Sequence, residues 1–413
     1  MLDLVKQTSN TKHLTPNIKK MKQAYIVAGY RTAVGKAKRG GFRFTSPVDL
    51  AAEVINALLD KVPQLDPDRI DDILVGNAVP EAEQGLQMSR WISVKSNLPE
   101  TVGGAIVNRY CGSGIETISM AVGKIQGGLA ECIIAGGTES MSLVPIMGYK
   151  TAVNFDLAKE HPDYYIGMGL TAEEVAVKYN VTREEADMFA YESHVKALKA
   201  QAANAFEGQI VPIEVEEVYY EDGKKKSRKF TVDTDEGPRA ETTPEALAGL
   251  RPVFKANGQV TAGNSSQTSD GAAFVIVMSE DMVKELGLQP IARMMSCTTV
   301  GVSPRYMGIG PVAAMPKALK LAGLQFKDLG LVELNEAFAA QSLAVLKETP
   351  DLDLNIVNVN GGALALGHPL GCTGAKLTVQ ILSELRKRKE KYGMVTACIG
   401  GGQGIAGIYE LLN

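Results

Sequence analysis

Cys111 is the side chain in this sequence best placed for nucleophilic chemistry. It lies in NRYCGSG, between an apolar run that predicts a strand (residues 105–107) and apolar residues at helical spacing: Ile115, Ile118, Val122, Ile125 and Leu129. A sulfur at the beginning of a helix lies near the positive end of the helix dipole, which favours the thiolate. Gly112 and Gly114 would allow the backbone to approach a bound carbonyl closely. A buried structural cysteine is the alternative.

Two further residues could cooperate with this cysteine. His368 lies in GGALALGHPLGCTGA, where glycines and a proline fix the loop, and a loop histidine can act as the base for a cysteine. A surface histidine in a turn is the alternative. Cys398 ends the last long predicted strand in CIGGG, and the consecutive glycine amides beside it could form an oxyanion hole. An ordinary strand cysteine is the alternative there.

Asn335 follows a predicted strand in LVELNEAF. Its amide could position a water or a carbonyl, or it could cap a helix. The three other cysteines lack such surroundings and are predicted to serve packing: Cys132, Cys297 and Cys372. Two cysteines at strand ends, a loop histidine and an asparagine favour carbon–carbon bond chemistry over hydrolysis. One cysteine can carry an acyl group while the other moves a proton.

The elements that must position these residues alternate between short apolar strands and amphipathic helices, which predicts an α/β protein with a mostly parallel sheet. An internal repeat is also visible. Residues 71–78, 105–114 and 131–140 each predict a strand followed by a turn marked by Gly or Asn, and residues 330–338, 355–363 and 396–404 do so in the same order. The sequence therefore predicts a duplicated fold.

Between the two halves the pattern changes to helices and a charged hairpin around Glu221 to Lys229, so residues 141–268 are predicted to be an inserted domain. The N-terminal half then comprises residues 21–140 and 269–289, and the C-terminal half residues 290–413. Residues 1–20 form a polar leader that is predicted to be disordered.

Composition narrows the class of protein. The chain has 413 residues, of which 45% are hydrophobic and 22% charged, which excludes disordered and collagen-like chains. The formal net charge of -4 gives no overall attraction to nucleic acid or to an anionic membrane. Five cysteines without a CxxC pair indicate a reducing compartment, and no apolar run approaches a membrane span of roughly 18 residues. We expect a cytoplasmic protein; a peroxisomal address formed by Lys6, Gln7, His13 and Leu14 is the alternative.

Five segments in order closely resemble the thiolase family: NRYCGSG, VTAGNSSQTSDGAA, NEAFAAQ, GGALALGHPLGCTGA and CIGGGQGIA. The similarity extends from about Met21 to the C-terminus. It implies a five-layered αβαβα core of two similar halves, an inserted CoA-binding loop domain, and homodimers or homotetramers.

The resemblance also implies roles for individual residues. Cys111 would be the acylated nucleophile, His368 its activating base, and Cys398 the acid/base at the acetyl α-carbon. One oxyanion hole would comprise His368 and a water held by Asn335, and the other the backbone amides of Cys111 and Gly400. No metal or permanently bound cofactor is implied, because CoA is a substrate.

Contacts with CoA follow from the same matching segments. Arg239 would lie near the adenosine, Ser266 near the pantetheine, and five residues would form the apolar lining: Phe254, Ala262, Met307, Ala337 and Phe338. The basic segment KKKSRK from Lys224 could add positive charge, but a solvated hairpin tip is the favoured interpretation.

One departure bears on the substrate. Biosynthetic short-chain thiolases commonly carry HMG in the loop domain, whereas this sequence has Gly167, Met168 and Gly169. The missing histidine gives the pocket more room, which favours degradative cleavage of 3-ketoacyl-CoA in β-oxidation. The alternatives are condensation of two acetyl-CoA and, from another class, a non-catalytic CoA-binding scaffold. A ketoacyl synthase is disfavoured because those enzymes lack a second cysteine at the position of Cys398.

Overall fold

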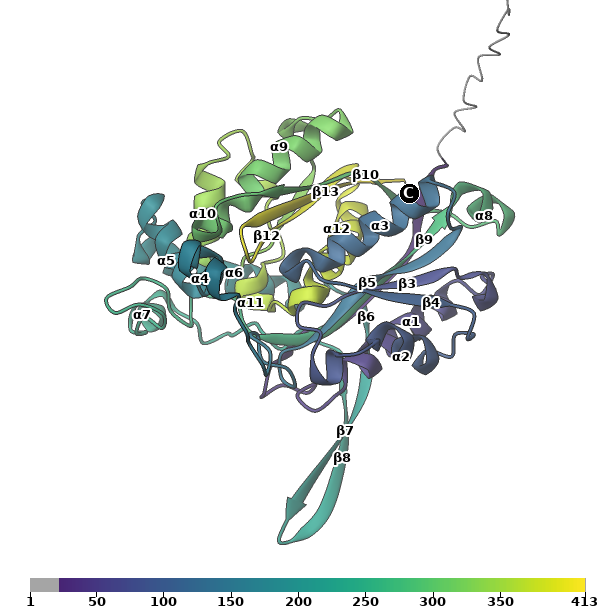
Figure 1. The fold of residues 1–413 in the computed structure, drawn as a ribbon, viewed down its shortest axis with the longest axis horizontal. Helices are drawn as coiled ribbons and strands as arrows, with labels where there is room; N and C mark the ends of the chain where they lie inside the picture. The colour runs from purple at the N-terminus through teal and green to yellow at the C-terminus, as the bar shows by residue number, and fades with distance from the viewer. Residues whose placement is uncertain (1–21, 413) are drawn as a thin grey trace, which may run out of the picture.

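The computed structural model describes residues 22–412 (Figure 1). The leader predicted for residues 1–20, with its alternative peroxisomal address, lies outside the described residues. Within residues 22–412, no helix combines the length and apolar character that crossing a bilayer requires.

The main strands form one continuous hydrogen-bonded sheet, in the order β11-β12-β13-β10-β1-β9-β5-β3-β4. The N-terminal part of the sheet contains β1 (Ala24–Thr32), β3 (Asp72–Gly76), β4 (Gly103–Val107), β5 (Cys132–Ser140) and β9 (Ser269–Ser279). The C-terminal part contains β10 (Ala292–Gly301), β11 (Leu331–Leu334), β12 (Tyr392–Ile399) and β13 (Gln403–Leu411). The two parts meet between β1 and β10, which are paired only at Ile26 and Ala292. The short strands β2 (Gly35–Lys36) and β6 (Ile210–Val211) pair with β9 and β1.

The predicted duplication is confirmed by the strand pairing. β3 runs parallel to both β4 and β5, and β11 runs parallel to β12 and to a bridge at Val357. The next strands, β9 and β13, are antiparallel to β5 and β12, and the strands after those, β1 and β10, are antiparallel again. The prediction of a mostly parallel sheet is therefore wrong. The alternation of strands and helices along the sequence does not reveal that a tight turn joins β12 to β13. Neighbouring strands joined by a tight turn must be antiparallel.

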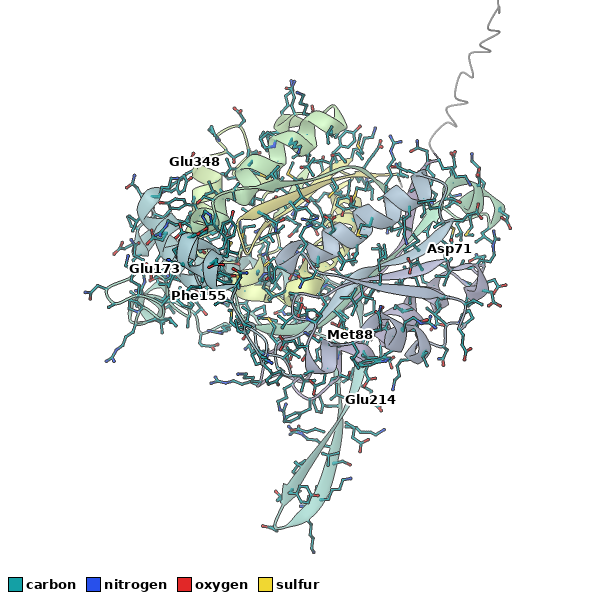
Figure 2. The ribbon with its side chains drawn as sticks, viewed as in Figure 1. Asp71, Met88, Phe155, Glu173, Glu214 and Glu348 are labelled. Carbon is teal, nitrogen blue, oxygen red and sulfur yellow. The ribbon has the colours of Figure 1, made fainter. Side chains whose placement is uncertain are left out.

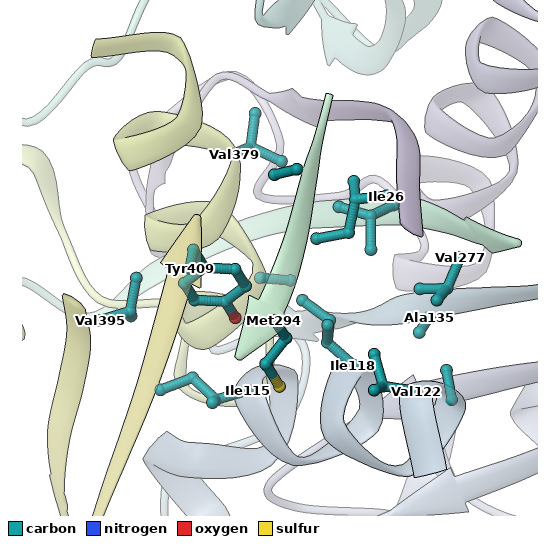
Figure 3. Packing of buried hydrophobic residues seen from close by; sticks show 14 of the residues in the cluster. Ile26, Ile115, Ile118, Val122, Ala135, Val277, Met294, Val379, Val395 and Tyr409 are labelled. Atoms are coloured by element: carbon teal, nitrogen blue, oxygen red, sulfur yellow. The ribbon is translucent and has the colours of Figure 1, made fainter. Parts of the chain in front are cut away.

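Helices cover both parts of the sheet and also separate them, which gives the expected αβαβα layers (Figure 1). α1 (Pro47–Lys61) and α2 (Met88–Lys95) cover the outer face of the N-terminal part, while α9 (Gly310–Ala322) and α10 (Ala339–Lys347) cover that of the C-terminal part. α3 (Ser113–Gln126) and α12 (Leu370–Arg388) form the middle layer. Figure 3 shows how this layer packs, with Ile115, Ile118 and Val122 of α3 facing Tyr409 and Met294 of the sheet.

The middle layer brings two helix N-termini together. A Cβ atom on Gly114 of α3 would lie 2.4 Å from the backbone nitrogen of Ala375, and one on Gly374 of α12 would lie 2.4 Å from that of Ile115. The two helix backbones therefore touch, and only glycine fits at this crossing. A Cβ on Gly112 would likewise meet the side chain of Ile399 at 2.7 Å. Packing therefore favours glycine at both positions, and the approach of their backbone to a bound carbonyl stays a prediction.

One residue of the predicted α3 pattern lies outside the helix. α3 ends at Gln126, and Leu129 is 79% exposed. The other four apolar residues of the pattern are buried, as their spacing predicts: Ile115, Ile118, Val122 and Ile125.

Between β5 and β9 the chain forms α4 (Phe155–Glu160), α5 (Met168–Lys178), α6 (Arg183–Ala202), α7 (Pro244–Ala248) and the hairpin of β7 (Ile213–Glu221) and β8 (Lys224–Val232). The hairpin projects from the body of the molecule (Figure 1). Three of its cations pair with acids of β7: Lys226 with Glu221, Arg228 with Glu217, and Lys229 with Glu214. α8 (Glu280–Glu285) and α11 (Ala363–Leu366) complete the helices of the described residues.

Candidate active site

Cys111 lies in the turn that leads from β4 into α3. One turn of 3₁₀ helix, Tyr110–Gly112, directly precedes α3, so the sulfur is at the helix N-terminus as predicted. Tyr110 has a left-handed φ of 43°, which is unusual for a residue with a bulky side chain. The hydroxyl of Ser113 secures this turn by accepting from the Arg109 amide at 2.9 Å and donating to the Tyr110 carbonyl at 2.7 Å.

Burial dominates the electrostatics of this thiol. It raises the pKa of Cys111 to about 12, although the backbone amides of Cys111 and Gly400 hydrogen-bond the sulfur and oppose the shift. Glu139 adds a smaller contribution that raises the pKa. The expectation of a thiolate is therefore wrong for the free protein. At neutral pH Cys111 is a thiol and needs a base before it can attack.

Cys398 lies beside Cys111 at the end of β12. It is fully buried, and burial together with the neighbouring Cys111 raises its pKa. The turn that follows contains Gly401 and Gly402, with φ angles of 81° and 85°. These conformations favour glycine and place the Gly400 amide against the Cys111 sulfur. The two amides predicted to form an oxyanion hole thus converge on one sulfur from opposite halves of the fold.

His368 is held inside the protein between α11 and α12. Only 3% of its surface is exposed, so the alternative of a surface histidine is wrong. Its backbone amide donates to the Gln267 carbonyl at 3.1 Å. Burial and the positive charge of Lys376 lower the pKa of His368 to about 3, so the imidazole is neutral at pH 7. A neutral imidazole has the free lone pair that a general base requires.

Asn335 contacts this imidazole directly. The Asn335 Nδ2 atom lies 3.3 Å from His368 Nε2, and both side chains are buried. The helix-cap alternative is wrong, because α10 begins at Ala339 and Phe338 occupies the N-cap position. The Oδ1 atom of Asn335 is buried without a hydrogen-bond partner in the described structure, so it can accept a bond from a water or a substrate group.

The cysteine and histidine segments also pack together. Leu370, two residues after His368, lies in one apolar cluster with Cys111, Ala78 and Met141. The structure therefore pairs Cys111 with Cys398 and Asn335 with His368, and the segment that follows His368 packs against Cys111.

Several predicted CoA contacts lie next to this centre. Met307, Ala337 and Phe338 pack in one cluster with Cys398, and the rings of Phe254 and Phe338 meet edge to face at 6.2 Å. The Ser266 amide donates to the Ala337 carbonyl at 3.0 Å. Arg239 is half-buried beside His194 of α6, and Ala262 is exposed, two residues after Val260.

The segment that contains Ser266 is fixed by a residue that the sequence did not point to. Glu173 of α5, labelled in Figure 2, accepts from the backbone amides of Gln259 and Val260 at 2.9 and 2.8 Å. Val260 itself packs in the cluster with Cys398. Glu173 therefore anchors the start of VTAGNSS against α5.

Glu139 is a second residue that sequence reasoning missed. Its buried carboxylate accepts hydrogen bonds from the amides of Ala78 and Gly371 at 2.8 Å each, and from the side chains of Gln84 at 2.8 Å and Asn77 at 3.2 Å. Gly371 belongs to the first turn of α12, three residues after His368, so Glu139 ties the histidine segment to the N-terminal half. A lone acid at the end of the buried strand IIAGGTE was the available signal.

The remaining cysteines are free thiols. Cys132 and Cys372 are buried in the apolar clusters, and Cys297 packs against the central one. Among residues 22–412, no group of three or more His, Cys, Asp or Glu side chains is arranged to hold a metal ion.

The pKa values predict how Cys111 reacts with an alkylating reagent. Because the thiolate is the reactive form and the pKa is about 12, the rate of alkylation by iodoacetamide should rise about tenfold per pH unit from pH 7 to 9. An exposed cysteine, with a pKa of about 8.5, should instead begin to level off over this range. Mass spectrometry of the Cys111 peptide measures the rate, with a short cysteine peptide as control. A plateau below pH 8 would contradict the assignment of a neutral thiol.

Nearly the whole chain is similar to known proteins. Residues 24–281 match the family model described as "Thiolase, N-terminal domain" and residues 288–411 match "Thiolase, C-terminal domain". A 3-ketoacyl-CoA thiolase of Bacillus subtilis is 52% identical over 95% of this chain and 100% of its own, and an acetyl-CoA acetyltransferase of Escherichia coli is 43% identical with the same coverage. The crystal structure of the Bacillus anthracis acetyl-CoA acetyltransferase superposes with a TM-score of 0.84 at 39% identity, covering 95% of this chain and 100% of that one.

Proposed function

This chain belongs to the thiolase family, and we propose that it is an acyltransferase that cleaves 3-ketoacyl-CoA with CoA to give acetyl-CoA and a shortened acyl-CoA. The observation that carries the proposal is the convergence of the Cys111 sulfur, the neighbouring Cys398 and the Gly400 amide, with the neutral His368 packed nearby. The similarity of the named 3-ketoacyl-CoA thiolase supports the choice of substrate class.

The first half of the reaction needs a base and an oxyanion hole. The lone pair of His368 takes the proton of the Cys111 thiol, and the sulfur attacks the keto carbon of the substrate. The developing oxyanion is stabilised by hydrogen-bond donors in a water-poor site. The bond between the α-carbon and the keto carbon then breaks, which leaves an acyl group on Cys111 and the enolate of acetyl-CoA. Cys398 donates its proton to the α-carbon, and acetyl-CoA leaves.

The second half transfers the acyl group. Cys398, now a thiolate, takes the proton of an incoming CoA thiol, whose sulfur attacks the thioester on Cys111. The acyl-CoA forms, and the Cys111 sulfur regains its proton from His368. We propose that the amides of Cys111 and Gly400 stabilise the oxyanion of the acyl-cysteine, because both already contact the sulfur.

Further aspects of the proposal rest on the family. CoA is a substrate and no permanently bound cofactor takes part in these steps. We propose that Arg239, Phe254, Ala262, Ser266, Met307, Ala337 and Phe338 contact the CoA and its acyl chain. We also propose that the protein is a cytoplasmic homodimer or homotetramer.

A second candidate function is the condensation of two acetyl-CoA, which two of the similar proteins suggest by their names. Gly167 favours cleavage of longer chains. It precedes α5 with φ -64° and ψ 143°, and a Cβ atom there would meet nothing within 4 Å, whereas one on Gly169 would overlap the ring of Phe254. The next residue, Met168, packs against the cluster that contains Cys398. The position therefore has open space next to a residue that packs against the Cys398 cluster.

We predict that the protein cleaves 3-ketohexadecanoyl-CoA at least as fast as acetoacetyl-CoA, and that Gly167→His shifts the ratio of kcat/KM toward acetoacetyl-CoA by about tenfold. The backbone at Gly167 suits any residue, so Gly167→Ala should leave the ratio within about twofold and is the matched control. Release of acetyl-CoA from each substrate measures both rates. Strict preference of the wild type for the four-carbon substrate would overturn the chain-length assignment. Absence of cleavage of either substrate would overturn the proposed function.

A further inference from the structure

The imidazole of His368 has a second buried partner, on the side away from Asn335. The Oγ1 atom of Thr373, in the first turn of α12, lies 2.6 Å from His368 Nδ1. Thr373 is 1% exposed and His368 is 3% exposed. A buried polar contact of this length in a low-dielectric site is costly to lose, because no solvent replaces it.

The direction of this hydrogen bond follows from the other bond that Thr373 makes. Its hydroxyl has one proton, which it donates to the Pro369 carbonyl at 2.9 Å. With that proton assigned to Pro369, the Thr373 oxygen is the acceptor toward His368, and the ring carries its proton on Nδ1. This leaves the lone pair on Nε2, where the Nδ2 group of Asn335 donates to it at 3.3 Å.

The opposite tautomer would require two changes at once. Thr373 would have to turn its proton from the Pro369 carbonyl to Nδ1, which leaves that bond unmade. A proton on Nε2 would also face the NH₂ group of Asn335, so two donors would meet unless the amide reversed. Thr373 and Asn335 thus act from opposite sides of the ring to hold the same tautomer.

We propose that Thr373 is the positioning residue of the general base: by accepting from Nδ1 it fixes the proton on that nitrogen and keeps Nε2 unprotonated, as deprotonation of Cys111 requires. The proposal rests on the proposed function, because it assigns to His368 the role of base in acylation. A hydrogen-bond acceptor on Nδ1 also raises the basicity of Nε2, as partners on the remote nitrogen of a histidine do in other sites. The charged group that acts on the ring from α12 is Lys376, and the variants below leave it in place.

The chain offers matched variants. Thr373→Val keeps the shape of the side chain and removes the oxygen, while Thr373→Ser keeps the oxygen. Thr378→Val is the control, because Thr378 is equally buried on the same helix but bonds to the Gly374 carbonyl and the Tyr409 hydroxyl. The measurement is the single-turnover rate at which acyl-CoA acylates Cys111, followed by mass spectrometry, together with KM in steady-state cleavage.

Thr373→Val should lower the acylation rate by about tenfold to hundredfold with KM within twofold, while Thr373→Ser and Thr378→Val stay within about threefold of the wild type. Ring-nitrogen NMR of the labelled protein, with His368 identified by a His368→Asn variant, should show the proton on Nδ1 in the wild type and a loss of that single state in Thr373→Val. A structural role alone would not change the tautomer.

Three results would overturn the inference. The proton could reside on Nε2 in the wild type, Thr373→Val could acylate as fast as the wild type, or Thr373→Ser could be as slow as Thr373→Val. Failure of the wild type itself to form an acyl-Cys111 would contradict the proposed function, which keeps the two failures distinct.

Discussion

Replacing Cys111 with alanine should abolish the acyl-enzyme and lower kcat by at least about 10⁴-fold, the scale seen when a covalent nucleophile is removed. The described site offers Cys398 as its other thiol, and that thiol is buried at the end of β12 with its own pKa raised. Incubation with acyl-CoA followed by mass spectrometry of the intact protein measures the acyl adduct directly, and release of acetyl-CoA measures turnover.

Cys132→Ala is the matched control for this experiment. Cys132 is fully buried, but it lies in the outer apolar cluster with α1 and α2 side chains, away from Cys111. Its replacement should leave the acyl adduct in place and change stability alone. An adduct that persists in Cys111→Ala, or that is lost in Cys132→Ala, would show that another residue carries the acyl group.

Replacing Cys398 with alanine should separate the two roles of the cysteines. The variant should still form an acyl-enzyme from acyl-CoA, because Cys111, His368 and the Gly400 amide remain. It should no longer exchange the α-protons of acetyl-CoA with deuterated water, because the group that moves this proton is absent. General acid–base catalysis contributes about 10²-fold to 10⁴-fold, so exchange should fall by that factor.

Proton NMR of acetyl-CoA in deuterated water follows this exchange. The wild type is the positive control, and Cys372→Ala, which removes another fully buried thiol, is the control for loss of a core sulfur. Cys372 lies in the central apolar cluster and has no role in the proposed reaction. Exchange retained in Cys398→Ala would contradict the acid/base role, and acylation lost in the same variant would show that Cys398 is needed to build the site.

The sequence predicted the local positions of the candidate site residues better than it predicted their electrostatics. Glycines and strand ends mark four residues in the sequence: Cys111, Cys398, His368 and Asn335. The predicted strand ends are present in the structure. The protonation states depend on burial by residues distant in the chain. The helix N-terminus at Cys111 suggested a thiolate, but desolvation outweighs it and the thiol keeps its proton.

Two other residues that bear on the site, Glu139 and Thr373, could not be recognised from the sequence. Glu139 acts on the segment of His368 through Gly371, and no local pattern links two residues so far apart. Thr373 is five residues from His368, but a threonine inside a helix gives no signal until the ring is seen to face it. The parallel arrangement expected of the sheet failed for a similar reason, because strand direction depends on which strands become neighbours.

The matched strand orders of the two halves place Cys111 and His368 at equivalent positions. Cys111 follows β4 and precedes α3, while His368 follows the bridging segment at Val357 and precedes α12. If one ancestral half was copied, then the proposed roles imply that a single location became a nucleophile in one copy and a proton acceptor in the other. Gly114 and Gly374 hold the two copies backbone to backbone at that location. Under the proposed roles each half carries only part of what the reaction needs, so we expect neither half to catalyse it alone.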